Sequence, residues 1–213
     1  MFVLHFCHRR GFYAVLVAFG LRLGYYYKVL TFKENYIMNV WHDLDPSRIT
    51  ETEFDCFLEI SKGSKIKYEL DKETGMLCLD RILHTSMVYP AAYGFIPRTL
   101  GGDNDPLDVF VLCSETLAPN TLVRVRPIGM ITMIDGGEPD EKVIAVAVKD
   151  PFYNKFNDCA ELPQHYFNEM IHFFMHYKDL ENKEVKVKAL STREEMLQVI
   201  RESITMYNKK FVK

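Results

Sequence analysis

Three aspartates within six positions are the strongest chemical signal in this sequence. Asp103, Asp105 and Asp108 lie in the segment 101–110, which reads Gly-Gly-Asp-Asn-Asp-Pro-Leu-Asp-Val-Phe. Pro106 excludes a helix interior there, and the two glycines favour a turn. The apolar run that follows predicts a buried strand. We therefore expect a stiff loop to hold the three carboxylates at the mouth of a strand.

Such a cluster requires positive charge close by. Two carboxylates about 5 Å apart repel each other by roughly 3 kcal/mol at an effective dielectric constant of about 20, so cations or a shared proton must offset the repulsion. Oxygen-only ligands favour Mg²⁺ or Mn²⁺ over zinc. A calcium EF-hand is excluded, because Leu107 stands at loop position five, Asp108 replaces the glycine of position six, and Ser114 stands at position twelve. A solvated acidic turn remains the alternative interpretation.

Other charged residues fall at the predicted strand ends. Asp135 and Asp140 flank the turn 136–139, and several cations stand beside or between the acids along the chain: Lys67, Arg81, Lys142 and Lys178. Metal ions held by acids and ringed by cations suit a multiply charged phosphate as substrate, because a metal-bound water becomes hydroxide near neutral pH. Lysine, arginine and tyrosine can neutralise the departing phosphate. The sequence contains no nucleophile elbow, which favours direct attack by water.

The elements that position these residues are mostly short strands. The segment 65–70 alternates, so Ile66, Tyr68 and Leu70 should share a buried face opposite Lys67 and Glu69. A hairpin turn over 71–75 follows, with Gly75 suited to a positive φ. Pro127 and Gly129 interrupt the long strand 122–134, which predicts a bend or bulge. Short strands joined by turns indicate a closed β-barrel.

Two helices near the C-terminus complete the predicted fold. Leu162-Pro163 opens the first helix, and Ser191 to Glu194 form a capping box for the second. The predicted apolar stripes are Phe167, Ile171 and Phe174 on the first helix, and Leu197, Ile200, Ile204 and Tyr207 on the second. The fold class is therefore α+β and mainly β, a barrel flanked by two helices.

Composition limits the remaining possibilities. The chain has 213 residues, 48% hydrophobic and 26% charged, and its net charge of −3 gives no basic footprint for nucleic acid. Five cysteines, an odd number without a C-x-x-C pair, argue against a disulfide or zinc framework. Cys56, Cys78 and Cys113 lie in apolar runs and should be small core residues in a reducing compartment, the cytoplasm.

Residues 1–37 do not match the rest of the chain. His8-Arg9-Arg10 precede an uncharged stretch over 11–21, and its eleven residues are too few for a bilayer, which needs about 18–20. No small-x-small cleavage site follows. We predict that 1–37 is a non-native extension of the reading frame or a removable segment, and that 38–213 is a single domain. A membrane anchor is the less favoured alternative, so no membrane contact is expected.

The segment Asp103 to Val109 resembles the D-x-D-P-x-D-hydrophobic signature of the family I soluble inorganic pyrophosphatases, in particular the bacterial type. The resemblance covers about residues 54–208 and includes further motifs: Lys67-Tyr68-Glu69, Asp80-Arg81, Tyr89-Pro90, Tyr93-Gly94, Arg126-Pro127 with Gly129, Asp135, and Phe173 to Leu180. It implies a five-stranded OB-like barrel with helices outside. It also implies Mg²⁺-dependent hydrolysis of pyrophosphate to two orthophosphates by direct attack of a metal-bound water.

The same resemblance implies a role for each site residue. Asp105 would be the general base. Asp103, Asp108, Asp135 and Asp140 would bind several Mg²⁺ ions, for which Mn²⁺ could substitute. The phosphate would be held by Lys67, Arg81, Lys142, Tyr177 and Lys178. The cleft would be completed by Glu59, Glu69, Tyr89 and Tyr93. The family also implies a homo-oligomer, a hexamer with a subunit contact on the helix that carries His172 and His176.

Two other functions remain open from the sequence. An OB-type barrel can bind nucleic acid, but that function needs a basic groove with stacking aromatics, whereas this candidate groove holds five aspartates. A metal-dependent hydrolase of longer polyphosphates or nucleotides is the other alternative, although no glycine-rich phosphate loop supports it. His172 and His176 have the spacing of a helical zinc pair but lack a nearby third ligand.

Overall fold

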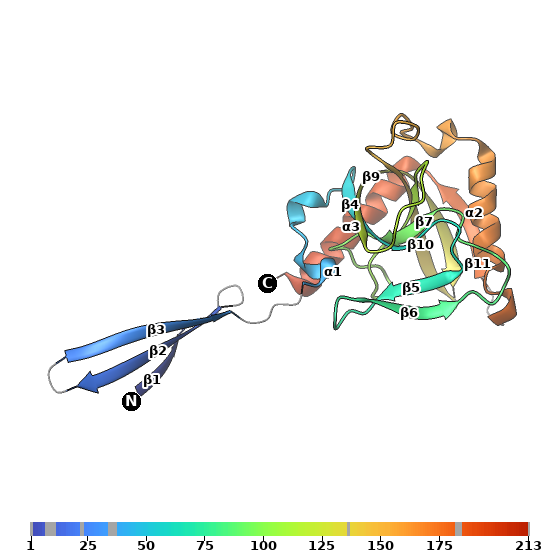
Figure 1. Ribbon diagram of the computed structural model, residues 1–213. Coiled ribbons are helices and arrows are strands. Elements are labelled where there is room, and N and C mark those ends of the chain that lie inside the picture. Colours follow the sequence, from blue (N-terminus) through green and yellow to red (C-terminus); the bar gives the residue numbers. More distant parts are fainter. Residues whose placement is uncertain are drawn as a thin grey trace. The chain divides into compact units, whose positions relative to one another are not determined.

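The computed structural model describes residues 2–6, 12–21, 24–33, 38–135, 137–181 and 185–212 (Figure 1). The chain divides into two compact units, Met1–Met38 and Asn39–Lys213. The first unit is an antiparallel sheet of β1 (Phe2–Phe6), β2 (Phe12–Leu21) and β3 (Gly24–Lys33), in that order. The apolar stretch discussed above thus forms the central strand of a small sheet, and the basic cluster 8–10 lies outside the described residues.

Within the described part of the second unit, five strands close into a ring. They are β4 (Phe54–Ile60), β7 (Ala92–Phe95), β8 (Asp108–Leu112), β9 (Thr121–Asp135) and β10 (Glu138–Ala147). The order is β10-β8-β7-β4-β9, and an additional β9–β10 pairing completes the circuit. Only β8 and β10 are parallel within this ring. The predicted closed five-stranded sheet is confirmed, and the fold is mainly β.

Three further strands of this unit lie outside the ring. β11 (Val185–Ser191) pairs with β9 outside the circuit. β5 (Ile66–Leu70) and β6 (Leu77–Ile82) form a separate hairpin, visible below the ring in Figure 1. Its turn follows the prediction, because Gly75 has a φ of 70° and donates its N–H to the Asp71 carbonyl at 2.8 Å.

The long strand β9 carries the predicted irregularity. Gly129 pairs with Ile144 and Pro127 with Ala145, so Ile128 is an extra residue on β9. A bulge at this point lets a residue without a backbone N–H sit inside a ring strand. Gly129 is required for a second reason, because a Cβ there would lie 1.9 Å from the Sγ of Cys159.

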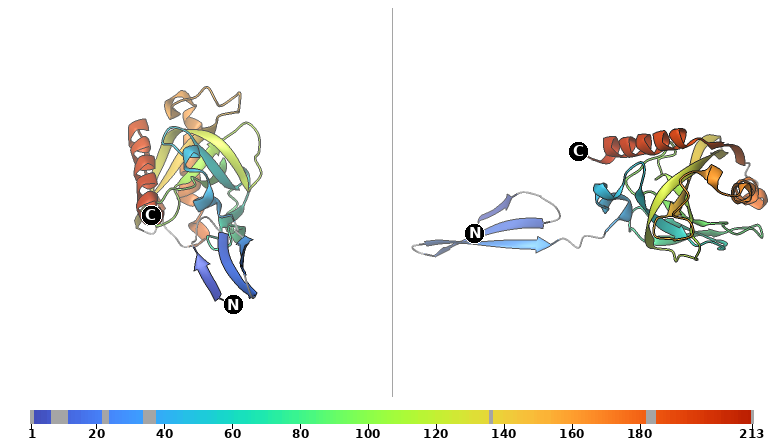
Figure 2. Two further views of the ribbon diagram at one scale, coloured as in Figure 1. Left: turned by 90° about the vertical axis from the view of Figure 1, so that its left-hand side faces the viewer. Right: turned by 90° about the horizontal axis from the view of Figure 1, so that it is seen from above.

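Two helices cover the ring, α2 (Gln164–His176) and α3 (Arg193–Phe211) (Figure 2). Alternate residues of β8 point to different clusters: Val109 and Val111 pack in the cluster that contains α3, whereas Phe110 and Leu112 pack in the cluster that contains α2. The predicted stripes are buried or half-buried, namely Phe167, Ile171, Phe174, Leu197, Ile200, Ile204 and Tyr207.

The start of α3 corrects the predicted capping box by one residue. Thr192 is the N-cap, and its side chain and that of Glu195 form the reciprocal hydrogen bonds. Ser191 instead ends β11, with its hydroxyl 3.1 Å from that of Thr132. The remaining short helices are α1 (Val40–Asp43), η1 (Pro46–Arg48), η2 (Cys159–Glu161) and η3 (Asp179–Glu181).

The cysteines follow the prediction only in part. Cys56 is buried and Cys113 half-buried, but Cys78 is exposed, because it lies on the two-stranded hairpin rather than in the ring. Cys7 lies outside the described residues. Among the helices of the described residues, none has the length and apolar character needed to cross a bilayer.

Candidate active site

The acidic loop is built by local hydrogen bonds between β7 and β8. The Gly101 N–H donates to the Asp105 carbonyl at 2.6 Å, and the Asp105 N–H donates to Asp103 Oδ1 at 3.0 Å. Asn104 takes a φ of 70° at the tip, a conformation that Asn tolerates better than most residues. Asp108 is the first residue of β8. The loop therefore presents Asp103, Asp105 and Asp108 from a fixed backbone, as predicted.

Strand register brings β10 alongside this loop. Lys142 is the parallel partner of Asp108, and Asp140 precedes Lys142 by two positions on the same strand face. The Lys142 ammonium contacts the Asp108 carboxylate and lies 2.6 Å from Asp140 Oδ1. Asp135 ends β9 opposite Glu138, but its side chain lies outside the described residues.

Burial gives these groups unusual proton affinities. Burial raises the pKa of Asp140 to about 6 because it disfavours the charged carboxylate; Lys142 opposes this rise, and the charges of Asp108 and Asp103 add to it. Burial, and after it the negative charge of Asp108, raises the pKa of Glu59 to about 8. The Leu70 N–H donates to Glu59 Oε1 at 2.7 Å and opposes this rise only in part. For both carboxyls, burial is the main cause of the raised pKa.

The donor chemistry fits a hard divalent cation. Asp103, Asp108 and Asp140 supply only oxygen atoms, and the charges of Asp108 and Asp103 add to the rise that burial causes in the pKa of Asp140. Within the described residues, however, no three Asp, Glu, His or Cys side chains are grouped closely enough to hold one ion. Lys142 instead provides the compensating charge between two of the acids. A metal ion would have to take over that role.

The hairpin of β5 and β6 supplies two of the predicted cations. Lys67 and Arg81 are direct partners across it, and the register shifts at the next position, where Asp80 is the extra residue. Asp80 lies between them, with its Oδ2 2.9 Å from Lys67 Nζ and 2.6 Å from Arg81 Nη1. Arg81 Nε also contacts Glu181 Oε1 at 3.0 Å, and Lys67 contacts Glu69. The acids therefore hold both cations in place.

Aromatic residues join the site to α2. Tyr89 packs against Tyr93 at 5.4 Å and against Phe173 at 4.8 Å between ring centroids. Tyr177 stacks on Phe173 at 4.9 Å, and Lys178 follows it with its ammonium 5.3 Å from the Tyr177 ring. All of these side chains are buried. Burial raises the pKa of the Tyr89 phenol and that of the Tyr93 phenol well above the usual value for tyrosine, so both hydroxyls stay protonated and can donate hydrogen bonds.

A cleft of about 120 Å³ opens at the acidic loop. Of the predicted residues, it is lined by Glu59, Lys67, Glu69, Tyr93, Asp103, Asp105 and Asp108. A shallower depression shares Asp103 and Asp108 and adds Asp140. The remaining predicted residues with described side chains do not line the cleft itself: Arg81, Tyr89, Lys142, Tyr177 and Lys178.

Sequence reasoning missed several residues at this site. Lys72 and Trp41 also line the cleft, and Lys72 contacts Asp105. Asp80 and Glu181 hold the cations, as described above. Lys72 lies in a charged hairpin turn, where a lysine is ordinarily solvated, so no local pattern distinguishes it from a surface residue. Glu181 could have been suspected from its position just after the segment 173–180.

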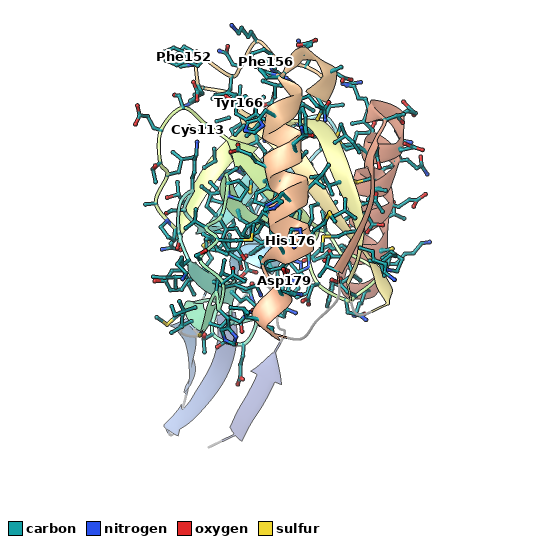
Figure 3. The ribbon with its side chains drawn as sticks, turned by 90° about the vertical axis from the view of Figure 1, so that its right-hand side faces the viewer. Cys113, Phe152, Phe156, Tyr166, His176 and Asp179 are labelled. Atoms are coloured by element: carbon teal, nitrogen blue, oxygen red, sulfur yellow. The ribbon has the colours of Figure 1, made fainter. Side chains whose placement is uncertain are left out.

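A larger cavity of about 770 Å³ lies along α2, away from the acidic loop. It shares Tyr89 with the site and is lined on the helix by His165, Glu169 and His172. Figure 3 shows this helix with Tyr166 toward one end and His176 and Asp179 at the other. His176 Nδ1 lies 2.9 Å from Asp179 Oδ2, so that histidine is engaged by a carboxylate.

Comparisons with known proteins point in one direction. The family model described as inorganic pyrophosphatase matches residues 56–208. The chain is 47% identical over 172 residues to soluble inorganic pyrophosphatase 2 of Chlamydomonas reinhardtii, covering 81% of this chain and 90% of that one. A solved inorganic pyrophosphatase from Helicobacter pylori is 41% identical with a TM-score of 0.74, covering 78% of this chain and 99% of its own. The solved inorganic pyrophosphatase from Thermus thermophilus is 36% identical with a TM-score of 0.77, and the match covers 80% of this chain and 99% of that one.

Proposed function

This chain belongs to the inorganic pyrophosphatase family and is an inorganic diphosphatase, and we propose that it uses Mg²⁺ to hydrolyse pyrophosphate to two orthophosphates by direct attack of water on phosphorus. The observation that carries this proposal is the composition of the cleft. A space of about 120 Å³ is lined by carboxylates, among them Asp103, Asp105 and Asp108, and by the ammonium-bearing residues Lys67 and Lys72. That space suits a small inorganic anion together with its counter-ions.

The aspartates would hold the metal ions. The proposed ligands are Asp103, Asp108, Asp135 and Asp140, with Mn²⁺ as a possible substitute for Mg²⁺. Bound there, magnesium would supply charge neutralisation for the phosphate oxygens and would acidify a water molecule. Support comes from one depression beside the cleft, which is lined by Asp103, Asp108 and Asp140 together. Lys142, released from Asp108 and Asp140, would then be available to the substrate.

Asp105 would act as the general base. Its side chain is 54% exposed and lines the cleft, so it can reach a water molecule beside the substrate. As the water oxygen bonds to phosphorus, the carboxylate takes the proton, and the bridging P–O bond breaks with its electron pair leaving on the second phosphate. Glu69 and Glu59 would order further water in the cleft.

The cations and phenols would stabilise the departing phosphate. Asp80 and Glu181 fix Lys67 and Arg81, so these charges need little reorganisation during the reaction. Tyr89, Tyr93, Tyr177 and Lys178 would complete the enclosure on the α2 side. The experiment is phosphate release from pyrophosphate with and without Mg²⁺, beside ATP and tripolyphosphate. We expect turnover only with Mg²⁺ and pyrophosphate, and comparable rates on ATP would overturn the substrate assignment.

Asp105→Asn tests the role of the base separately. The amide cannot accept the proton, so we expect a loss of at least about 100-fold in kcat. The variant should keep its fold, because the Asp105 side chain is half-exposed. Near wild-type turnover in this variant would remove Asp105 from the base role without affecting the diphosphatase assignment.

We further infer a homo-oligomer, a hexamer, with a contact on α2. Support comes from the exposed surface of this helix, where His172 lies beside His176 at 4.7 Å between ring centroids and Met175 is 45% exposed. A buried apolar contact with another copy would cover this surface. Sedimentation velocity measures the assembly directly, and a monomer at micromolar concentration would contradict the inference.

We also infer a cytoplasmic location and a mature chain that lacks residues 1–37. The free thiols among the described residues, such as Cys56 and Cys159, suit a reducing compartment. Mass spectrometry of the native protein should show a terminus near Met38, and an intact Met1 would refute the removable segment. Fractionation of the source cells tests the compartment, and recovery with membranes or organelles would contradict it.

A further inference from the structure

The rim of the cleft is formed in part by α1, which precedes the residues 56–208 matched by the family. Asn39 caps this helix, with its Oδ1 accepting from the Trp41 N–H at 3.0 Å. Trp41 is 4% exposed, and its indole N–H donates to the Thr99 carbonyl at 2.9 Å. Trp41 also lines the cleft. The helix therefore holds a rigid aromatic wall beside the acidic loop.

Lys72 from the hairpin turn lies against this wall. The Asn39 side-chain amide donates to the Lys72 carbonyl at 2.8 Å, which fixes the backbone. The Lys72 ammonium lies 5.5 Å from the centroid of the Trp41 ring, within the range of a cation–π interaction. The same ammonium contacts the Asp105 carboxylate. Lys72 thus connects α1 to the proposed base.

Asp105 needs such a partner. Its backbone N–H is held by Asp103, but its side chain is 54% exposed and extends from the loop into the cleft. A half-exposed carboxylate otherwise samples several staggered rotamers. We propose that Lys72 is a positioning residue that keeps the Asp105 carboxylate directed into the cleft, and that Asn39 and Trp41 hold Lys72 in place. This inference rests on the proposed role of Asp105 as base.

The exposure of Lys72 and Asp105 sets the size of the expected loss in rate, and the role of Lys72 decides whether kcat or KM changes. Lys72 is 48% exposed, so solvent screens its interaction with Asp105, and its removal should cost about fivefold in rate. A residue that acts through the base should lower kcat and leave the KM for pyrophosphate unchanged. A residue that binds phosphate directly should raise KM instead, so the two roles can be separated.

The experiment measures kcat and KM for pyrophosphate at saturating Mg²⁺ in Lys72→Met, which keeps the alkyl chain over Trp41 and removes the charge. We expect kcat to fall about fivefold with KM within about twofold of wild type. Lys72→Arg should recover most of the rate, because the guanidinium also stacks on indole and pairs with a carboxylate. Lys209→Met, on the exposed surface of α3, is the matched control and should behave as wild type.

A double variant separates this inference from the proposed function. In Asp105→Asn, the additional Lys72→Met change should have almost no effect, because the residue through which Lys72 acts is already lost. An undiminished fivefold loss in that background would overturn the inference, as would a raised KM with unchanged kcat. Wild-type turnover in Asp105→Asn alone would overturn the base assignment and, with it, this role of Lys72.

Discussion

Lys142 lies directly opposite Asp108 on the parallel pair of strands β10 and β8, and its ammonium occupies the space between Asp108 and Asp140. Lys142 is 5% exposed. Burial would lower its pKa, but the two carboxylates outweigh burial and raise it. The protein therefore keeps its own cation between two of the proposed metal ligands.

Replacing Lys142 with Met should destabilise the metal-free protein. The change leaves Asp108 and Asp140 without their shared counter-charge, and because both carboxylates retain some contact with water, we expect a loss of about 2–3 kcal/mol in the free energy of unfolding. Urea denaturation in EDTA measures this loss. Mg²⁺ should restore much of the stability, since a bound cation replaces the ammonium.

Lys209→Met serves as the control for these measurements, because Lys209 is exposed on α3. It should leave the denaturation midpoint unchanged with or without Mg²⁺. A Lys142→Met protein as stable as wild type in EDTA would show that Lys142 does not carry the charge balance of the acids.

Glu59 should make the stability of the metal-free protein depend on pH. Its folded-state pKa of about 8 lies above the ordinary value of 4.5, so its stabilising contribution is full below about pH 4.5 and is lost as the pH rises through about 8. Glu59→Gln cannot ionise and still offers an oxygen to the Leu70 N–H. Between about pH 5 and pH 9, the free energy of unfolding of the wild-type protein should fall by up to about 4 kcal/mol more than that of this variant. Parallel stability curves for the two proteins would contradict the buried, protonated state of Glu59.

His176→Ala should weaken the proposed assembly. The change removes the bond to Asp179 and part of the exposed surface of α2. We expect a lower sedimentation coefficient at low protein concentration, while His84→Ala, at an exposed position beyond β6, should sediment as wild type. An unchanged coefficient for His176→Ala across a dilution series would place the subunit contact elsewhere.

Local chemistry made much of the fold predictable from sequence. Pro106 excludes a helix interior and the paired glycines favour a turn, and Pro127 with Gly129 favours a bulge where the strand is paired on both sides. The closed ring of strands followed from these features together with the short alternating segments. One error was a shift of one residue: Thr192 rather than Ser191 caps α3, because Ser191 is needed to end β11. Another was Cys78, which is exposed on the hairpin and not in the core.

Contacts between distant segments could not be predicted in the same way. The position of Lys142 between two acids depends on the register of β10 against β8, and a shift of one residue would turn its side chain to the other face. The contact of Lys72 with Asp105 depends on how the hairpin lies against the acidic loop. Neither arrangement leaves a pattern in the local sequence.

The most direct test is a crystal structure of the protein soaked in Mn²⁺ and phosphate, with anomalous scattering to locate the metal. We expect metal peaks among Asp103, Asp108 and Asp140, with the Lys142 ammonium moved away from both Asp108 and Asp140 toward the phosphate. Aspartates that point apart into solvent with no peak between them, and Lys142 still paired with Asp108, would contradict it.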